Sequence, residues 1–192
     1  MTPVRDQRTT LRFLRHGATV ANLLGLRCGG DLDLPLAKAG REQAVEAAQR
    51  IAALHPPVRL IVTSDLKRTR ETAQIIARVL GEVTIVVEPD FAERSLGEWN
   101  LRSIDGTQPW LERGLTPPGG EPLATFDGRV ARAARRALAC LPDRALLVGS
   151  KGVGRVLAEL AGLPARVDLD NAALAEFDLG SCLVPATARG IA

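Results

Sequence analysis

Short apolar stretches of strand-forming residues alternate along this chain with stretches whose apolar residues recur at helical spacing. The stretch from Leu60 to Ser64 is apolar and rich in β-branched residues, as expected of a strand that is covered on both faces. In the next stretch, from about Lys67 to Leu80, the apolar residues repeat on one face of a helix. Alternation of this kind is typical of α/β proteins. We therefore predict a three-layer α/β/α sandwich with a mostly parallel central sheet.

The other elements continue this order. Predicted strands cover about 11–15, 60–64, 83–87, 145–149 and, at the edge of the sheet, 173–177; predicted helices cover about 40–54, 67–80, 123–141 and 152–161. Residues 95–121 hold glycines, prolines and both tryptophans, and we expect an irregular excursion there on the substrate side, with a short helix around Trp110. Because the chain has 192 residues and no repeat or linker, we expect one domain over residues 1–192.

Charge and cysteine content narrow the class of protein. Lysines and arginines number 25 against 22 acidic residues, which suits an anionic small molecule but falls short of a nucleic-acid-binding surface. Arg129, Arg132, Arg135 and Arg136 cluster at the spacing of a solvated helix face. Three cysteines, Cys28, Cys140 and Cys182, are far apart and match no zinc or redox motif. These features predict no nucleic-acid partner and free thiols in a reducing cytosol.

No stretch of the chain resembles a targeting or membrane-spanning segment. The first ten residues are polar and lack the apolar core of a signal peptide, and no apolar run is long enough to cross a bilayer. We therefore expect a cytoplasmic protein without a membrane partner.

Charged residues follow three of the predicted buried strands. Arg15 and His16 end the first strand, Arg68 opens the helix after the second, and Lys151 follows the strand at 145–149. The carboxyl ends of parallel strands lie along one edge of a sheet, where ligands of α/β proteins usually bind. The sequence therefore predicts that these four side chains converge on one ligand.

Their chemistry suits phosphoryl transfer. A neutral imidazole such as that of His16 is a competent nucleophile near neutral pH, and the planar guanidinium groups of Arg15 and Arg68 bind phosphate oxygens in pairs. The leaving oxygen then needs a proton donor. Glu93 is our candidate because it follows the strand that ends near Val87, and Glu98 is the competing carboxylate, which spacing alone does not separate from it.

Several neighbouring residues allow two interpretations. Asn22 either touches the substrate or holds its loop in place, and Trp99 and Trp110 either line a pocket or anchor their loop to the core. Gly149 to Gly154 is a weak match to a nucleotide-binding loop, because it lacks the spacing of the phosphate-binding motif. Cys28 is expected to be a small loop residue, since no histidine is available to activate it.

Five ordered blocks of the chain resemble the histidine phosphatase superfamily, the phosphoglycerate-mutase-like proteins, across most of its length. These blocks are Arg15-His16-Gly17-Ala18-Thr19 with Asn22; Asp33-Leu34-Pro35-Leu36 with Gly40 and Gln43-Ala44; Ser64-Asp65-Leu66-Lys67-Arg68 with Glu71-Thr72-Ala73; Glu93 with Gly97-Glu98-Trp99; and Pro118-Gly119-Gly120-Glu121 with Phe126 and Arg129. Five blocks in family order make a chance match negligible. The resemblance implies the phosphoglycerate-mutase-like fold.

The resemblance also implies roles for individual residues. His16 would take the phosphoryl group without a metal or cofactor, Arg15 and Arg68 would bind it, and Glu93 would handle the proton. Gly17, Thr19, Asn22 and Gly152 would lie on the substrate side. The chain departs from the family at Lys151, where the pattern has a second pocket histidine. The other histidine of the chain, His55, precedes two prolines and does not replace it.

Lysine retains the positive charge of that position but changes its chemistry. Its ammonium group is compact, hydrated and carried on a flexible stem, and its ordinary pKa is about 10.4 against about 6.5 for histidine. Three outcomes are open: a phosphatase with a lysine clamp, a slower or altered enzyme, or a phosphate-ligand binder without turnover.

We expect retained chemistry, because the nucleophile, both arginines and the candidate acid are all present. The expected activity is hydrolysis of a small phosphorylated metabolite, such as a sugar or nucleoside phosphate. The substrates of the family's shorter, phosphatase-like members, which this chain resembles, include α-ribazole phosphate. A catalytically impaired binding or regulatory protein is the alternative. A phosphoglycerate mutase is less favoured, because mutases tend to carry longer insertions. The expected oligomeric state is a monomer or a homodimer.

Overall fold

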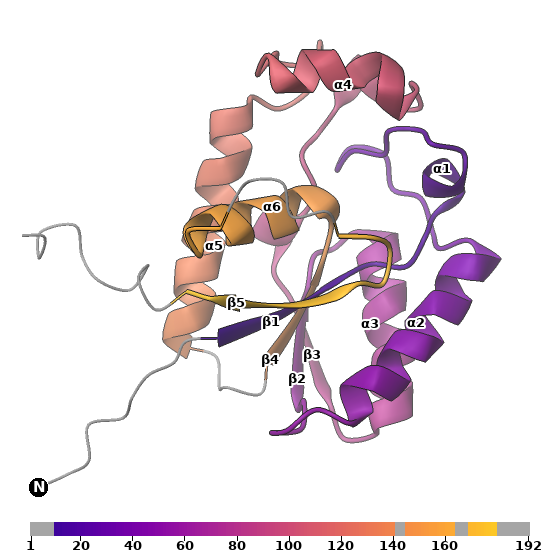
Figure 1. Cartoon of the computed structure of the whole chain (residues 1–192), viewed down its shortest axis with the longest axis vertical. Helices are drawn as coiled ribbons and strands as arrows, with labels where there is room; N and C mark the ends of the chain where they lie inside the picture. The colour runs from indigo at the N-terminus through magenta and orange to yellow at the C-terminus, as the bar shows by residue number, and fades with distance from the viewer. Residues whose placement is uncertain (1–9, 141–144, 164–168, 180–192) are drawn as a thin grey trace, which may run out of the picture.

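A central five-stranded sheet organises the protein (Figure 1). The structure is a computed structural model that describes residues 10–140, 145–163 and 169–179. The sheet contains β1 (Thr10–Arg15), β2 (Leu60–Thr63), β3 (Thr84–Val87), β4 (Ala145–Gly149) and β5 (Leu174–Asp178), in the order β3-β2-β4-β1-β5. All neighbouring pairs are parallel except β1 with β5. The mostly parallel sheet and the edge strand are therefore confirmed, and the antiparallel direction of that edge strand is added by the structure.

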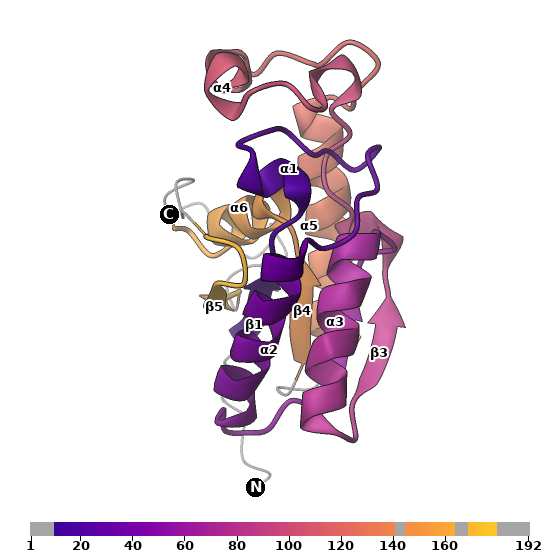
Figure 2. The ribbon, with the colours of Figure 1, turned by 90° about the vertical axis from the view of Figure 1, so that its right-hand side faces the viewer.

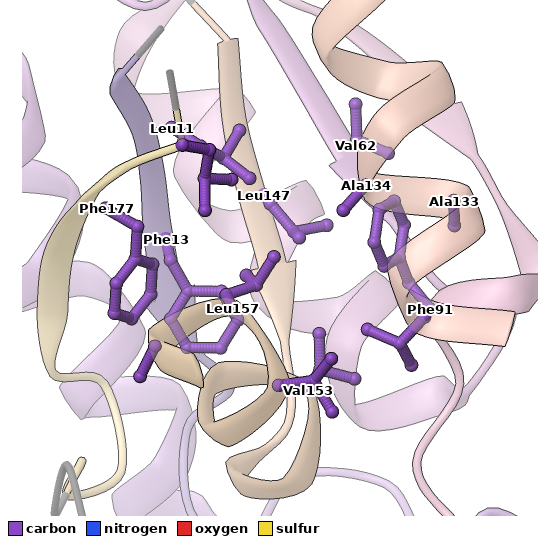
Figure 3. Packing of buried hydrophobic residues seen from close by; sticks show 14 of the residues in the cluster. Leu11, Phe13, Val62, Phe91, Ala133, Ala134, Leu147, Val153, Leu157 and Phe177 are labelled. Carbon is purple, nitrogen blue, oxygen red and sulfur yellow. The ribbon is translucent and has the colours of Figure 1, made fainter. Parts of the chain in front are cut away.

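Helices cover both faces of the sheet, which gives the predicted three layers. On one face, α2 (Lys38–Ala52) and α3 (Lys67–Leu80) lie side by side (Figure 2) and bury Ile51 and Ile76 against β1, β2 and β4. On the other face, α5 (Leu123–Cys140) and α6 (Lys151–Leu160) bury a second apolar cluster. Phe13 and Phe177 meet there at a centroid distance of 5.9 Å (Figure 3). β4 is buried along its whole length because both faces are covered.

Most element boundaries agree with the sequence prediction. α3 and β4 begin and end where predicted, and Gly81 ends α3 with a positive φ of 83°. α2 begins two residues earlier than predicted, because its N-cap residue Ala37 makes no side-chain cap that the sequence could signal. The last residue of the predicted helix 123–141, the polar residues 1–9 and Cys182 lie outside the described ranges.

The segment on the substrate side contains more regular structure than expected. It holds the short 3-10 helix η2 (Gly97–Trp99) and α4 (Ile104–Glu112), which includes Trp110 as predicted; the 3-10 helix η1 (Pro89–Phe91) precedes it. The sequence did not predict α1 (Val20–Leu23), because four residues are too few to show a helical period. Both α1 and α4 lie at the end of the molecule toward which β1, β2 and β4 run (Figures 1 and 2). Within the described ranges, no helix has both the length and the apolar character needed to cross a membrane.

Candidate functional site

His16 sits directly after β1, at the edge of the sheet where the parallel strands end. Its backbone N–H donates to the carbonyl of Gly149 at the end of β4 (2.9 Å), so the ends of both strands are tied together at this residue. The imidazole is buried. Burial, followed by the positive charges of Arg68 and Arg15, holds the pKa of His16 well below its usual value. The ring is therefore neutral at neutral pH.

A single hydrogen bond fixes which nitrogen of His16 can react. Nδ1 lies 2.7 Å from the carbonyl oxygen of Gly17. A carbonyl only accepts hydrogen bonds, so Nδ1 carries the proton and Nε2 keeps its lone pair. His16 is thus a neutral imidazole whose Nε2 is the nucleophilic atom.

The loop after His16 is held by two helices from elsewhere in the chain, α2 and α3. The Gly17 N–H donates to Thr72 Oγ1 (3.2 Å), and the Ala18 N–H donates to Gln43 Oε1 (2.9 Å). A Cβ at Gly17 would lie 2.1 Å from the carbonyl oxygen of Gly40, so the N-terminal turn of α2 packs against this backbone. Gly17 is therefore a close-packing residue of the nucleophile loop.

Arg68 lies in the first turn of α3 and is the largest fully buried side chain of the described residues. Nη1 donates to the carbonyl of Leu32 (3.0 Å) and Nη2 to that of Gly29 (3.1 Å), whereas the buried Nε has no hydrogen-bond partner. Among the described residues, no carboxylate forms a salt bridge with Arg68. Because a buried cation without an anion is costly, this guanidinium is suited to an anionic ligand.

Arg15 is partly buried beside His16, and its Nη1 donates to the carbonyl of Leu169 (2.6 Å). The positive charges of both arginines lower the pKa of His16, so the structure brings Arg15, His16 and Arg68 together as the sequence predicted.

Glu93 approaches the same edge of the sheet from the chain between η1 and η2. Its Oε1 accepts a hydrogen bond from the Arg94 N–H (2.7 Å), and its Oε2 accepts one from the Gly152 N–H in the first turn of α6 (2.9 Å). The positive end of a helix dipole favours a carboxylate at this place. Glu98, the competing carboxylate, is exposed in η2. The structure therefore favours Glu93 as the carboxylate of the site.

The start of α6 contains Lys151, the residue at which the sequence predicts a departure from the family pattern, and Ser150 before it. Ser150 is the N-cap residue and is buried, with no hydrogen-bond partner for its hydroxyl in the described structure. Lys151 is the first residue of the helix and is exposed. A Cβ at Gly152 would lie 2.2 Å from Glu93 Oε1, so glycine is required here for the carboxylate to reach the helix. Gly152 thus contacts Glu93, whereas the sequence placed it on the substrate.

Comparison with known proteins decides the family. The model of the histidine phosphatase superfamily (branch 1) matches residues 11–182. The chain belongs to this superfamily. It is 37% identical to a protein of Photorhabdus laumondii named probable phosphoglycerate mutase GpmB, and the alignment covers 86% of this chain and 83% of that one.

Solved structures of the same fold include a mycobacterial glucosyl-3-phosphoglycerate phosphatase in complex with VO3. It is 30% identical, with a TM-score of 0.73 and coverage of 87% of this chain and 91% of that one. A candidate α-ribazole-5'-P phosphatase from Escherichia coli K-12 is 27% identical, with a TM-score of 0.67 and 82% coverage of both chains. The relatives of this chain thus include proteins named as phosphatases and as probable phosphoglycerate mutases.

Thr19 and Asn22 form the capping box of α1. The Thr19 N–H donates to Asn22 Oδ1 (3.0 Å), and the Asn22 N–H donates to Thr19 Oγ1 (3.3 Å). Asn171, which the sequence did not point to, donates through Nδ2 to the carbonyl of His16 (3.0 Å) and to Asn22 Oδ1 (3.4 Å). Of the two interpretations of Asn22, the structure favours the one in which it holds the loop.

The two tryptophans anchor the substrate-side segment. Trp99 is buried, and its ring centroid lies 5.1 Å from that of Trp110 in α4. Arg27, another residue that the sequence did not indicate, donates to Thr107 Oγ1 (2.8 Å) and to Gln108 Oε1 (2.8 Å) and so ties α4 to the loop after α1. These contacts favour the anchoring role of the tryptophans.

The described residues contain no group of three or more His, Cys, Asp or Glu side chains that could hold a metal ion. Cys28 is a free thiol whose pKa is raised, first of all by burial, so it is a poor nucleophile at neutral pH. The sequence prediction for Arg129 is wrong: this arginine of α5 does not lie on a solvated face but is largely buried against Glu121.

Proposed function

We propose that this protein hydrolyses phosphomonoesters through a phosphohistidine intermediate on His16. One observation carries the proposal: a buried, neutral imidazole with a free Nε2 lies beside the guanidinium groups of Arg15 and Arg68. The guanidinium of Arg68 is itself buried without a described carboxylate partner. A nucleophile beside one buried and one partly buried guanidinium is suited to attack on a phosphate group.

The first half of the reaction transfers the phosphoryl group to the protein. The lone pair of His16 Nε2 forms a bond to phosphorus while the bond between phosphorus and the ester oxygen breaks. Glu93 gives its proton to the leaving oxygen, so an alcohol departs rather than an alkoxide. Arg15, Arg68 and Lys151 stabilise the negative charge of the phosphoryl oxygens.

The second half regenerates the protein. A water molecule attacks the phosphorus of phospho-His16 while the carboxylate of Glu93 takes one of its protons. The bond between nitrogen and phosphorus breaks, its electron pair returns to Nε2, and inorganic phosphate leaves. The Arg94 and Gly152 N–H groups hold the carboxylate in the interval between these proton transfers.

The names of two relatives support a proposal for the substrate class. Among the solved structures of the same fold, one is named a glucosyl-3-phosphoglycerate phosphatase and one a candidate α-ribazole-5'-P phosphatase. We propose a sugar or nucleoside phosphate as the substrate, with α-ribazole phosphate as one example. A panel of such esters, assayed by release of inorganic phosphate, identifies the substrate as the ester with the highest kcat/KM.

A mutase activity is the less favoured version of the same chemistry. It deserves a test because the curated relatives are named probable phosphoglycerate mutases. We expect the protein to release phosphate from its substrate and not to convert 3-phosphoglycerate into 2-phosphoglycerate. Interconversion without phosphate release would overturn the hydrolase assignment while leaving phospho-His16 intact.

A binding or regulatory protein is the alternative from a different class, and Lys151 is the observation in its favour. An ammonium group keeps the charge for phosphate binding but does not reproduce the hydrogen-bond geometry of an imidazole. Changing Lys151 to His separates the outcomes. A large gain in turnover marks the lysine as a loss of function, and a fall in turnover marks it as adapted to the substrate.

Trapping of the intermediate tests the proposed function directly. The protein is mixed with para-nitrophenyl phosphate carrying labelled phosphorus, quenched rapidly and examined for acid-labile phosphate on His16. We expect label on the wild-type protein and none on His16→Asn. If neither label nor turnover appears with the ester panel while vanadate or phosphate still binds, the protein is a binder and not an enzyme.

A further inference from the structure

Glu93 lies in a part of the chain where regular secondary structure does not fix the backbone. It follows η1 and precedes η2, outside every strand of the sheet. Its carboxylate is held by two N–H groups, but the position of the residue depends on what holds its backbone. A proton donor displaced by about 1 Å loses on the order of 100-fold in rate, so this support matters for catalysis.

One arginine supplies that support. Arg129, in α5, donates through Nη1 to the carbonyls of Asp90 (2.8 Å) and Ala92 (2.7 Å), and through Nη2 to the carbonyl of Glu93 itself (3.0 Å). These carbonyls span the four residues that end at the candidate acid. The guanidinium therefore binds the backbone that presents Glu93.

A carboxylate from a second loop orients the same guanidinium. Glu121 accepts hydrogen bonds from Arg129 Nε (2.8 Å) and Nη2 (2.9 Å), and both side chains are largely buried, with exposures of 14% and 16%. These two hydrogen bonds to Glu121 and the three to backbone carbonyls use all five N–H bonds of the guanidinium. The Phe126 ring lies 4.9 Å from the same group. No other side chain offers five donors in this planar arrangement.

Glu121 also holds the chain on the other side of Glu93. Its N–H donates to the carbonyl of Ser95 (2.9 Å), and its carbonyl accepts from Arg94 Nε (2.7 Å). Arg94 in turn supplies the N–H that binds Glu93 Oε1. Arg129 and Glu121 thus bind the backbone immediately before and after Glu93.

We infer that Arg129 and Glu121 form a positioning pair that sets the proton donor Glu93 for the step in which the leaving group departs. This inference rests on the proposed function and adds to it a device for the acid. Neither residue touches the reacting atoms. Their effect passes through the position of Glu93, so it depends on how much the leaving group needs a proton.

Two esters of similar shape separate this role from a general structural one. The phenolate of phenyl phosphate leaves poorly without a proton, whereas the para-nitrophenolate of para-nitrophenyl phosphate leaves without much help. We expect Arg129→Lys to lower kcat for phenyl phosphate by about 100-fold and for para-nitrophenyl phosphate by less than about 5-fold, with KM nearly unchanged. Glu121→Gln, which keeps the backbone contacts of residue 121, should show the same selectivity with a smaller loss.

Arg136 provides the matched control. It lies on the same helix and binds Asp90 Oδ2 (2.8 Å) and Glu88 Oε2 (3.3 Å), but it makes no hydrogen bond to Glu93 and is half exposed. Because exposed ion pairs contribute little, Arg136→Lys should change kcat for either ester by less than about 2-fold. Thermal unfolding of each variant shows that the folded state is retained.

A double-mutant cycle completes the test. If Arg129 acts through Glu93, then Arg129→Lys should cost almost nothing further for phenyl phosphate once Glu93 is replaced by Gln. Equal losses for both esters, or additive losses in the cycle, would overturn the positioning role while leaving the phosphatase in place. Absence of a phosphoenzyme in the wild-type protein would instead remove the proposed function, and the positioning role with it.

Discussion

His16 follows a buried strand of the central sheet, whereas Glu93 lies in irregular chain between two short 3-10 helices. Around His16, the support comes from Gly40 and Gln43 of α2 and Thr72 of α3, the two helices packed on one face of the sheet. Around Glu93, the support comes from Arg129 of α5, from Glu121 just before α5 and from Gly152 of α6. These two helices cover the opposite face of the sheet. The nucleophile is thus built into the core, and the acid is attached to it by hydrogen bonds from long side chains and a helix end.

This comparison predicts different consequences for the two sides. Because the residues around His16 are closely packed, almost no substitution there should be tolerated. Removal of His16 itself should stop the reaction with every ester. A carboxylate held by polar contacts should be displaced without loss of the fold, and the cost should vary with the leaving group.

The largest effect is expected from His16→Asn. Removing the nucleophile should lower kcat by on the order of 10⁴-fold or more for phenyl and para-nitrophenyl phosphate alike. Arg15 and Arg68 remain, so vanadate should still bind, as measured by calorimetry. Substantial turnover of either ester by this variant would show that another group attacks phosphorus.

Alanine at two glycines compares the sides directly. At Gly17, a Cβ meets the backbone of Gly40 at 2.1 Å, whereas at Gly152 it meets the Glu93 carboxylate at 2.2 Å. A backbone cannot move aside, so Gly17→Ala should cost about 2 kcal/mol of folding stability and most of the activity with both esters. Gly152→Ala should stay folded and lose about 100-fold for phenyl phosphate only. Urea unfolding and steady-state rates measure both, and similar behaviour of the two variants would refute the contrast.

The difference between the two sides also explains which parts of the fold and the site can be predicted from the sequence. β4 and α3 were predicted to the residue, because buried parallel strands are continuously apolar and amphipathic helices repeat their apolar residues. His16 and Arg68 were predicted to meet because both follow strands of one sheet. These are consequences of local pattern and topology.

The supports that bind backbone carbonyls leave no comparable signal in local pattern or topology. Arg129 binds backbone carbonyls 36 to 39 residues away, and Asn171 binds the carbonyl of His16 from 155 residues away. A carbonyl acceptor carries no residue identity, so no pattern marks such a contact. Arg129 was therefore placed on a solvated face by its helical spacing, although its side chain is largely buried.

The burial of His16 predicts a pH dependence of stability. Its folded-state pKa is depressed, so below about pH 6.5 the unfolded chain takes up a proton that the native protein does not. The stability present above the unfolded-state pKa should therefore fall as the pH drops from 7.5 to 5.5, by about 1 kcal/mol from this residue. Urea unfolding at both pH values should show a smaller fall for His16→Asn. An equal fall in both proteins would mean that His16 titrates normally.

The smallest effect is expected at the loop behind the nucleophile. The Asn22 side chain completes the capping box of α1 and accepts a hydrogen bond from Asn171. The Asn22→Ala variant loses both contacts. Asn22→Ala should therefore cost about 1 kcal/mol in urea unfolding, with KM for para-nitrophenyl phosphate within about 2-fold of the wild type. Asn171→Ala is the companion variant, because its amide touches the same loop through the carbonyl of His16. A large rise in KM for Asn22→Ala alone would assign Asn22 to the substrate, because losing the support of the loop affects both variants.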